Sequence, residues 1–320
     1  DYFKTLFEIR YIKTTKQSLS IFKPKDTYLI FGGSVNRFVP GLGQNPKSGV
    51  TFDYYLNQDI DTLTLTLDVL KNGNILRTIS SEKVHNFKSW PGGPPKPQTL
   101  PAKEGYNRFT WDFNRNALPG IENVFVHGSH VGGSVAPGNY TLRLTLGKVT
   151  AETEVTILKD PTVNATAAAY NEQQVMIDQI EAAIREIHES VNSMRSVKTQ
   201  LQDYAKLLKD NEEANSLLNT GEVLIKKINA WERQLIQPDQ KTFQDVINFN
   251  NKLSSQLMHL KGYIEAVDPA ITAGAKERLS DLISTWNVYQ NERDDLMNKD
   301  MTSFNAQFSE LNLPAIIIKD

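Results

Sequence analysis

The sequence predicts a multidomain β and α protein: an immunoglobulin- or fibronectin-like β-sandwich followed by an antiparallel four-helix bundle. In the first half, apolar and polar residues alternate in short runs separated by glycine and proline, as in half-buried strands. After Pro161, apolar residues recur every three or four positions in long stretches, as on amphipathic helices. No Gly/Ser-rich spacer separates the two patterns. We therefore expect the sandwich and the bundle to keep a fixed relative orientation.

The composition limits the classes of function. The chain has 320 residues, enough for two domains, and 35 Lys and Arg against 37 Asp and Glu give a net charge of −2. That balance gives no electrostatic support for a nucleic-acid partner, which favours a basic surface. No apolar run approaches the roughly 18 residues of a membrane span. The sequence contains no cysteine, which excludes disulfides, zinc–thiolate sites and thiol catalysis.

Residues 23–160 are predicted to form the sandwich. The strand pattern covers 49–56, 63–69, 75–79, 105–113 and the hairpin 138–158. Asn72-Gly73 is a strong signal for a tight hairpin turn. The prolines of 90–97 lack the N–H that a sheet interior requires, so this stretch is predicted to be a loop. The apolar segment 1–22 is expected to leave, or pack on, an upstream domain.

Residues 161–312 are predicted to form the helical bundle, with 313–320 as a tail. Four segments carry the helical apolar period, namely Ile177–Leu208, Ala214–Leu235, Phe243–Val267 and Leu279–Leu311. Asn164 or Thr166 is the expected N-cap of the first helix. Because the connections are short, sequential helices are expected to be antiparallel neighbours.

The sequence contains no convincing catalytic or metal motif, so we predict no catalytic residue, no metal and no cofactor. A di-metal bundle site needs Glu-x-x-His, but the residues three before His188 and His259 are arginine and glutamine. His127 and His130 lie in a loop and could bind a ligand through two imidazoles. No carboxylate is placed nearby as a third metal ligand, and loop histidines in solvent are the simpler interpretation.

Trp90 and Asn250 are the two other candidate residues. Trp90 lies among prolines and glycines and could form an aromatic platform for a sugar or a peptide, although packing onto the sandwich is the favoured interpretation. Asn250 falls on the apolar side of the third predicted helix. A buried asparagine there would fix the register of the bundle. A cap or a bond to a neighbouring loop carbonyl is the equal alternative.

Several short motifs occur in a characteristic order: Phe22–Tyr28, 43–50, Asp53–Leu56, Gly105–Asp112, Ala136–Thr145, Lys159–Pro161 and Asn248–Leu253. In order and spacing they resemble the C-terminal region of large secreted bacterial β-propeller proteins of Bacteroidetes. These are the sortilin-like (VPS10-like), BNR-repeat glycosyl hydrolases. The resemblance covers most of 22–312 and implies an upstream propeller, which this chain lacks, and export to the periplasm or cell surface.

The function expected from these features is a non-catalytic accessory or interaction region of such a protein. The sandwich and bundle would act as a rigid protein-contact or spacer module, with the upstream propeller or another protein as partner. One alternative is that the chain is part of a glycoside hydrolase whose active site lies in the propeller. Another is carbohydrate binding through Trp90 and the 119–137 loop.

Overall fold

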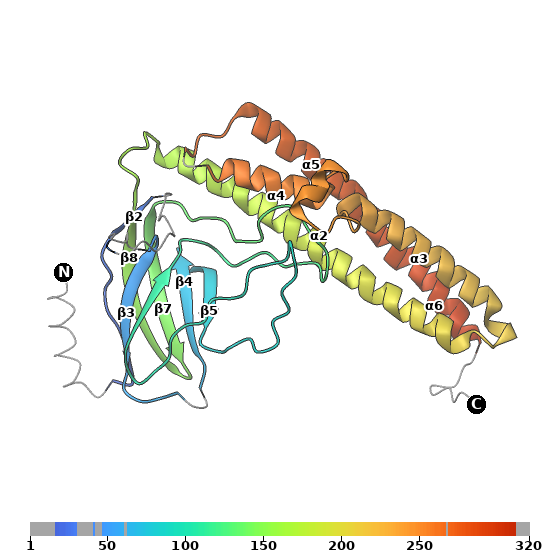
Figure 1. The fold of residues 1–320 in the computed structure, drawn as a ribbon, viewed down its shortest axis with the longest axis horizontal. Helices are drawn as coiled ribbons and strands as arrows, with labels where there is room; N and C mark the ends of the chain where they lie inside the picture. The colour runs from blue at the N-terminus through green and yellow to red at the C-terminus, as the bar shows by residue number, and fades with distance from the viewer. Residues whose placement is uncertain (1–16, 31–40, 42–46, 61–62, 267, 312–320) are drawn as a thin grey trace.

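The computed structural model describes residues 17–30, 41, 47–60, 63–266 and 268–311. Within these ranges the chain is a mixed β and α protein, with strands up to Lys159 and helices from Ala167 onward (Figure 1). The predicted division into a β part and a helical part is therefore confirmed. Most of the segment 1–22 and the tail 313–320 lie outside the described residues.

The strands form two sheets that share one hydrophobic core. The three-stranded sheet has the order β1 (Leu19–Ile21), β3 (Val50–Leu56), β6 (Gly105–Trp111). The five-stranded sheet has the order β2 (Thr27–Leu29), β8 (Val149–Lys159), β7 (Gly138–Leu146), β4 (Leu65–Lys71), β5 (Asn74–Ser80). Neighbours are antiparallel except β2 and β8, which are parallel. Apolar side chains from both sheets meet in the same buried cluster.

The predicted domain boundary after residue 22 is wrong. Leu19–Ile21 already pairs with Tyr54–Leu56 as strand β1, and Leu19 is buried in the core. A strand of three residues is too short to produce a periodic signal, so the sequence pattern could not reveal it. The turn at Asn72-Gly73 is as predicted, since both residues have positive φ and close the β4–β5 hairpin.

The helical part begins at α2 (Ala167–Leu208), whose N-cap is Thr166; its Oγ1 accepts from the Ala169 N–H at 3.2 Å. The helices that follow are α3 (Asn215–Leu235), α4 (Leu253–Ile264) and α5 (Ala273–Asp295). A π-helical turn, Leu296–Asp300, joins α5 to α6 (Met301–Glu310). The fourth predicted helix is therefore one rod with an irregular turn inside it.

The helices do not form four antiparallel neighbours as predicted. The hydrogen bonds of α2 show the direction of its neighbours. Along α2 from its N-terminus, Gln173 contacts the end of α4, His188 contacts the start of α4, and Arg195 contacts the end of α3. α3 and α4 therefore run in the same direction and occupy successive stretches beside α2. The α5–α6 rod lies along both of them (Figure 1). The four helices thus form a three-helix bundle whose middle member is interrupted.

The interruption is the segment 236–252. The third predicted helix was expected to span Phe243–Val267, but the structure has a short 3-10 helix at Phe243–Ile247 and begins α4 only at Leu253. Phe243 and Ile247 are 65% and 83% exposed, so their spacing does not reflect a buried stripe. Asp245 accepts from the Thr242 N–H at 2.9 Å in a capping box that fixes this turn.

Candidate functional site

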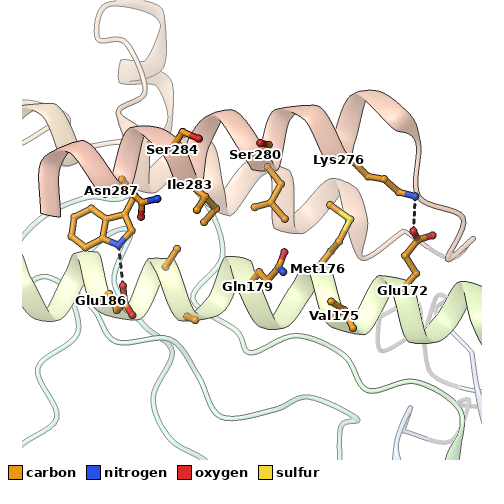
Figure 2. Close-up of a pocket in the computed structure, with 14 residues that line it drawn as sticks. Glu172, Val175, Met176, Gln179, Glu186, Lys276, Ser280, Ile283, Ser284 and Asn287 are labelled. Atoms are coloured by element: carbon orange, nitrogen blue, oxygen red, sulfur yellow. Dashed lines mark hydrogen bonds and ion pairs between the residues drawn. The ribbon is translucent and has the colours of Figure 1, made fainter. Parts of the chain in front are cut away.

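A groove between α2 and α5 has a volume of about 670 Å³ (Figure 2). Its lining is about half apolar and half polar, with Val175 and Met176 from α2 and Ile283 from α5 among the apolar side chains. Both glutamates in it are already bonded: Glu172 to Lys276 at 2.5 Å and Glu186 to Nε1 of Trp286 at 2.9 Å. The groove therefore offers no free acid and base pair for chemistry.

The segment between β6 and β7, residues 112–137, is the most unusual feature of the structure, and we call it the connection. It leaves the sheets, reaches the helices and returns (Figure 1). Its two arms are bonded to each other: the Leu118 N–H donates to His130 O at 2.8 Å, and the Val135 N–H to Phe113 O at 3.0 Å. The connection is therefore an ordered excursion and not a loose loop.

The tip of the connection belongs to the core of the helices. Leu118, Ile121, Val124 and Val126 are each at most 3% exposed and lie in the same buried cluster as the apolar side chains of α2, α3, α4 and α5. Burying one such side chain contributes about 1.5–3 kcal/mol. A segment that is covalently part of the sheet region thus completes the hydrophobic core of the bundle.

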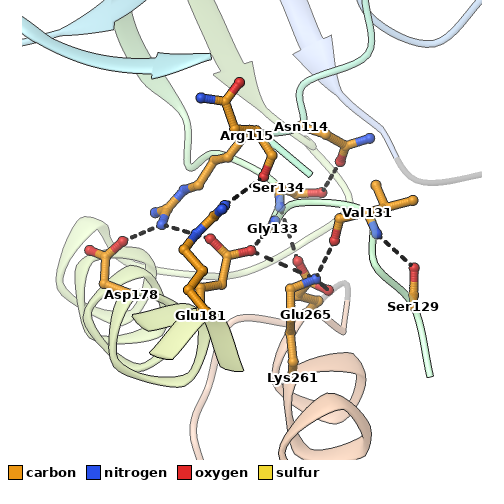
Figure 3. Close-up of polar contacts among 12 residues, drawn as sticks. Asn114, Arg115, Ser129, Val131, Gly133, Ser134, Asp178, Glu181, Lys261 and Glu265 are labelled. Carbon is orange, nitrogen blue, oxygen red and sulfur yellow. Dashed lines mark hydrogen bonds and ion pairs between the residues drawn. The ribbon is translucent and has the colours of Figure 1, made fainter. Parts of the chain in front are cut away.

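A buried ion cluster holds the base of the connection on the helices (Figure 3). Arg115 pairs with Asp178 of α2, and its Nη1 lies 3.8 Å from Oε2 of Glu181. Lys261 of α4 pairs with Glu265 at 2.9 Å and lies 4.0 Å from Glu181. Arg115, Glu181 and Lys261 are all buried, so the cluster depends on each partner being present.

The same carboxylates also bind the backbone of the connection. The Gly133 N–H donates to Oε1 of Glu181 at 2.6 Å, and the Ser134 N–H donates to Oε1 of Glu265 at 3.0 Å. Lys261 donates to the Val131 carbonyl at 2.9 Å. Burial raises the pKa of Glu181, while the Gly133 N–H and the nearby Lys261 and Arg115 oppose that rise.

Glycine is required where the connection meets α2. A Cβ on Gly133 would lie 2.5 Å from Cγ2 of Ile177, and one on Gly132 would lie 2.3 Å from the Asn116 carbonyl oxygen. Gly133 therefore permits close contact with α2, and Gly132 permits close contact between the two arms of the connection.

His130 is buried in this joint and does not face solvent as the simpler interpretation expected. Its Nδ1 lies 3.1 Å from Pro119 O and its Nε2 3.1 Å from Gly92 O. His188 of α2 also contacts Pro119 O, through Nδ1 at 2.6 Å, and its Nε2 lies 2.6 Å from Oγ of Ser254 on α4. The two rings therefore share one carbonyl between the connection and the helices.

His127 lies at a second point of the joint. Its Nδ1 is in hydrogen-bonding contact with Nε2 of His259 on α4, and its ring lies 4.8 Å from that of Phe243. Nε2 of His127 is buried and has no hydrogen-bond partner among the described residues. His127 and His130 are therefore both placed against helices, but they do not converge on one ligand.

Trp90 packs inward. Its Nε1–H donates to Val124 O at 2.9 Å, and its ring lies against Gly93 and Gly120. The indole thus supports the connection, in agreement with the packing interpretation. Asn250 precedes α4 and is exposed, so its predicted position on a buried helical seam is wrong.

Sequence reasoning did not find the ion cluster. Glu181 falls beside Ile180 and Ile184 on the apolar side of α2, and Lys261 falls between Leu260 and Ile264 on α4. A charge inside an otherwise apolar helical stripe was the available signal, because such a charge needs a buried partner.

Two further classes of site were sought in the part of the chain that the structure describes. It contains no group of three or more His, Cys, Asp or Glu side chains placed to hold a metal ion. None of the described helices has the length and apolar character needed to cross a membrane.

The chain was also compared with known proteins. No family model and no curated protein matches it. One solved structure, described as "pT26-6p", is 11% identical, with a TM-score of 0.13, over 78% of this chain and 47% of that one. The match thus spans about half of that structure's chain.

Proposed function

We propose that this chain is a non-catalytic interaction or spacer region in which the sheets and the helices act as one rigid body. The carrying observation is the connection: its apolar tip completes the helical core, and its base is fixed by the Arg115–Glu181–Lys261 cluster. Domains that move relative to each other usually meet through small, polar interfaces. Here the interface with the helices is apolar, and the backbone of the connection extends into it. Rigidity of this kind suits a part that sets the position of its neighbours.

We further propose that the two sheets form an immunoglobulin-like sandwich. Two features support this assignment. The hydroxyl of Tyr140 donates to Ala136 O four residues upstream, as in the tyrosine corner of such sandwiches. Trp111 is fully buried and lies 5.7 Å from the Tyr140 ring. A buried tryptophan in the core between the sheets is a second hallmark of this architecture.

We propose that the region belongs to an exported protein with a β-propeller. It would either contact the propeller or hold a partner protein at a fixed distance from it. The sequence resemblance alone supports this context. The glycoside hydrolase alternative gains no support from the groove, whose carboxylates are already bonded. The carbohydrate alternative relied on Trp90 and the 119–137 loop as a binding surface. It gains no support, because Trp90 and the tip of the connection pack inward.

Distance measurements between spin labels test the rigid-body proposal. The chain has no cysteine, so paired cysteines at Lys148 in the β7–β8 turn and Glu222 on α3 can be labelled selectively. We expect a single distance distribution as narrow as that of a control pair, Glu189 and Glu222, which lies within the helices. A distribution several times broader than the control would contradict the proposal.

A second measurement addresses the lack of catalysis. The chain is expected to release no product from a panel of aryl glycosides. Turnover that is abolished by a single substitution, such as Glu172→Gln in the groove, would favour the enzyme alternative. In a protein that also carries a propeller, hydrolase activity can be compared with and without residues 17–311. Equal activity of the two forms would leave the enzyme alternative without support.

A further inference from the structure

The histidines of this chain are concentrated at the joint. The sequence has five, and four of them, namely His127, His130, His188 and His259, lie where the connection meets α2 and α4. The fifth, His85, is exposed in the segment between β5 and β6. Histidine is the side chain whose charge ordinarily changes between pH 5 and 8. The charge of this interface can therefore change with pH.

His188 is held in a neutral form by its surroundings. It is fully buried, its Nδ1–H donates to Pro119 O, and its Nε2 accepts from the Ser254 hydroxyl. No carboxylate among the described residues bonds to it, and the titratable group that acts on it is His130. An imidazolium at this position would be a buried charge without a counter-ion, which is costly unless the interface opens.

The His127–His259 pair has the same preference. A contact between two ring nitrogens needs one donor and one acceptor, so both rings cannot be protonated while it persists. In the tautomer in which the His127 Nδ1–H donates to His259, protonation of His127 would also place a proton on its buried Nε2, which has no hydrogen-bond partner among the described residues. Phe125 and Phe243, the other rings near His127, offer no counter-charge.

We propose that these histidines make the joint sensitive to acid, so that their protonation releases the connection from α2 and α4. This goes beyond the proposed rigid module but rests on it, since release would convert a rigid body into two parts that move independently. It assigns to the joint a conformational response between neutral and mildly acidic conditions.

The direction follows from the burial of the rings. The pKa of His188 is lowered to about 4, mainly by burial and in part by the nearby His130, against the opposing effect of the hydrogen bond to the Pro119 carbonyl. Burial also lowers the pKa of His127 and of His130, although hydrogen bonds to carbonyls oppose this for His130. A histidine with a depressed pKa stabilises the closed joint above its free value of about 6.5. That stabilisation is lost as the pH falls towards the depressed value.

The charged groups that face the connection do not cancel this response. They are Asp178, Glu181, Arg185 and Arg195 from α2, Lys261 from α4 and Glu265 at its C-cap. Burial raises the pKa of Glu181, so the closed joint takes up a proton there more readily than the open one, and this carboxylate partly opposes release as the pH falls. A Glu181→Gln variant removes that contribution and separates it from the histidines.

Hydrogen exchange on the complete chain measures the release. Peptides covering 113–135 report on the connection and peptides covering β7 report on the sheet. Exchange is followed from pH 7.5 to 5.0 and corrected for intrinsic rates. One deeply buried histidine changes the opening equilibrium roughly tenfold per pH unit below 6.5, so we expect protection of 113–135 to fall about 30-fold. Protection of β7 should change less than about threefold.

The variants assign the effect. His188→Asn retains a donor for Pro119 O but cannot titrate, and should reduce the acid-dependent loss to a few-fold. His85→Asn, the matched control, should respond like the unmodified protein. Equal protection of 113–135 at pH 7.5 and 5.0 would overturn the proposal.

A loss that persists unchanged in His188→Asn would also overturn it. If that variant folds poorly, Glu181→Gln gives the second test. Because Glu181 opposes release at low pH, the acid-dependent loss should persist or grow in this variant, and its disappearance would overturn the proposal. Broad label distances already at pH 7.5 would instead contradict the rigid module, so the two failures are distinguishable.

Discussion

Gly133 lies where the backbone of the connection meets α2, and a Cβ there would lie close to Ile177 and to the Glu181 and Glu265 carboxylates. Its N–H is one of the bonds that Glu181 accepts. A single methyl group at this position would separate the two surfaces, because a contact of 2.5 Å from Cβ to carbon cannot be relieved without moving helix or backbone.

Gly133→Ala is therefore expected to destabilise the protein by about 1–3 kcal/mol, measured by urea unfolding at pH 7.5. Gly262→Ala on α4 is the matched control, since a Cβ there meets nothing within 4 Å. In a helix that substitution should stabilise by about 0.5–1 kcal/mol. Similar effects at the two positions would contradict the contact described for Gly133.

Glu181 offers a second test at the residue scale. Replacing it by Ala leaves the Gly133 N–H without its acceptor and removes a buried carboxylate beside Arg115 and Lys261, which keep Asp178 and Glu265 as partners, whereas Gln retains one acceptor oxygen. We expect Glu181→Ala to cost about 3–5 kcal/mol, as when one partner of a buried ion pair is removed, and Glu181→Gln to cost less. Thermal unfolding of both variants checks this order, and a reversed order would argue against the cluster.

At the scale of elements, the cap of α2 distinguishes two candidates that the sequence could not separate. The Thr166 hydroxyl accepts from the Ala169 N–H, while Asn164 lies upstream of the cap. Thr166→Ala should cost about 1 kcal/mol and Asn164→Ala nearly nothing, measured by chemical denaturation. The opposite result would move the start of α2.

The tip of the connection is the second element with a clear expectation. Ile121→Ala should cost about 2–5 kcal/mol because the side chain is fully buried in the helical core. Ile247→Ala, on the exposed 3-10 turn, should change stability by less than about 0.5 kcal/mol. Unfolding midpoints of the two variants compare them directly, and equal costs would mean that the tip does not occupy the core.

For the whole molecule, the anchoring of the connection in the helical core predicts that sheets and helices unfold together at pH 7.5. Single-tryptophan variants that keep Trp111 in the sheet core or Trp286 in the bundle report on each part by fluorescence. Their urea midpoints should coincide, as expected for one cooperative unit. Midpoints separated by more than roughly 0.5 M would indicate two independent domains.

The sequence by itself determined the β and helical regions, the strand and helix periods, and the Asn72-Gly73 turn. Each of these is a local pattern, which a few neighbouring residues are enough to produce. The interruption at 236–252 was missed because the spacing of Phe243 and Ile247 imitates a helical stripe although both side chains are exposed.

Only the tertiary structure decided how the two parts are joined. The sequence suggested that the short link at Pro161 holds them in place, whereas the structure fixes them through the connection. Its anchors join residues far apart in the chain: Gly133 to Glu181 across 48 positions and Ser134 to Glu265 across 131. Contacts over such separations depend on how the folded elements pack. The periodicity of apolar residues within one segment therefore cannot predict them.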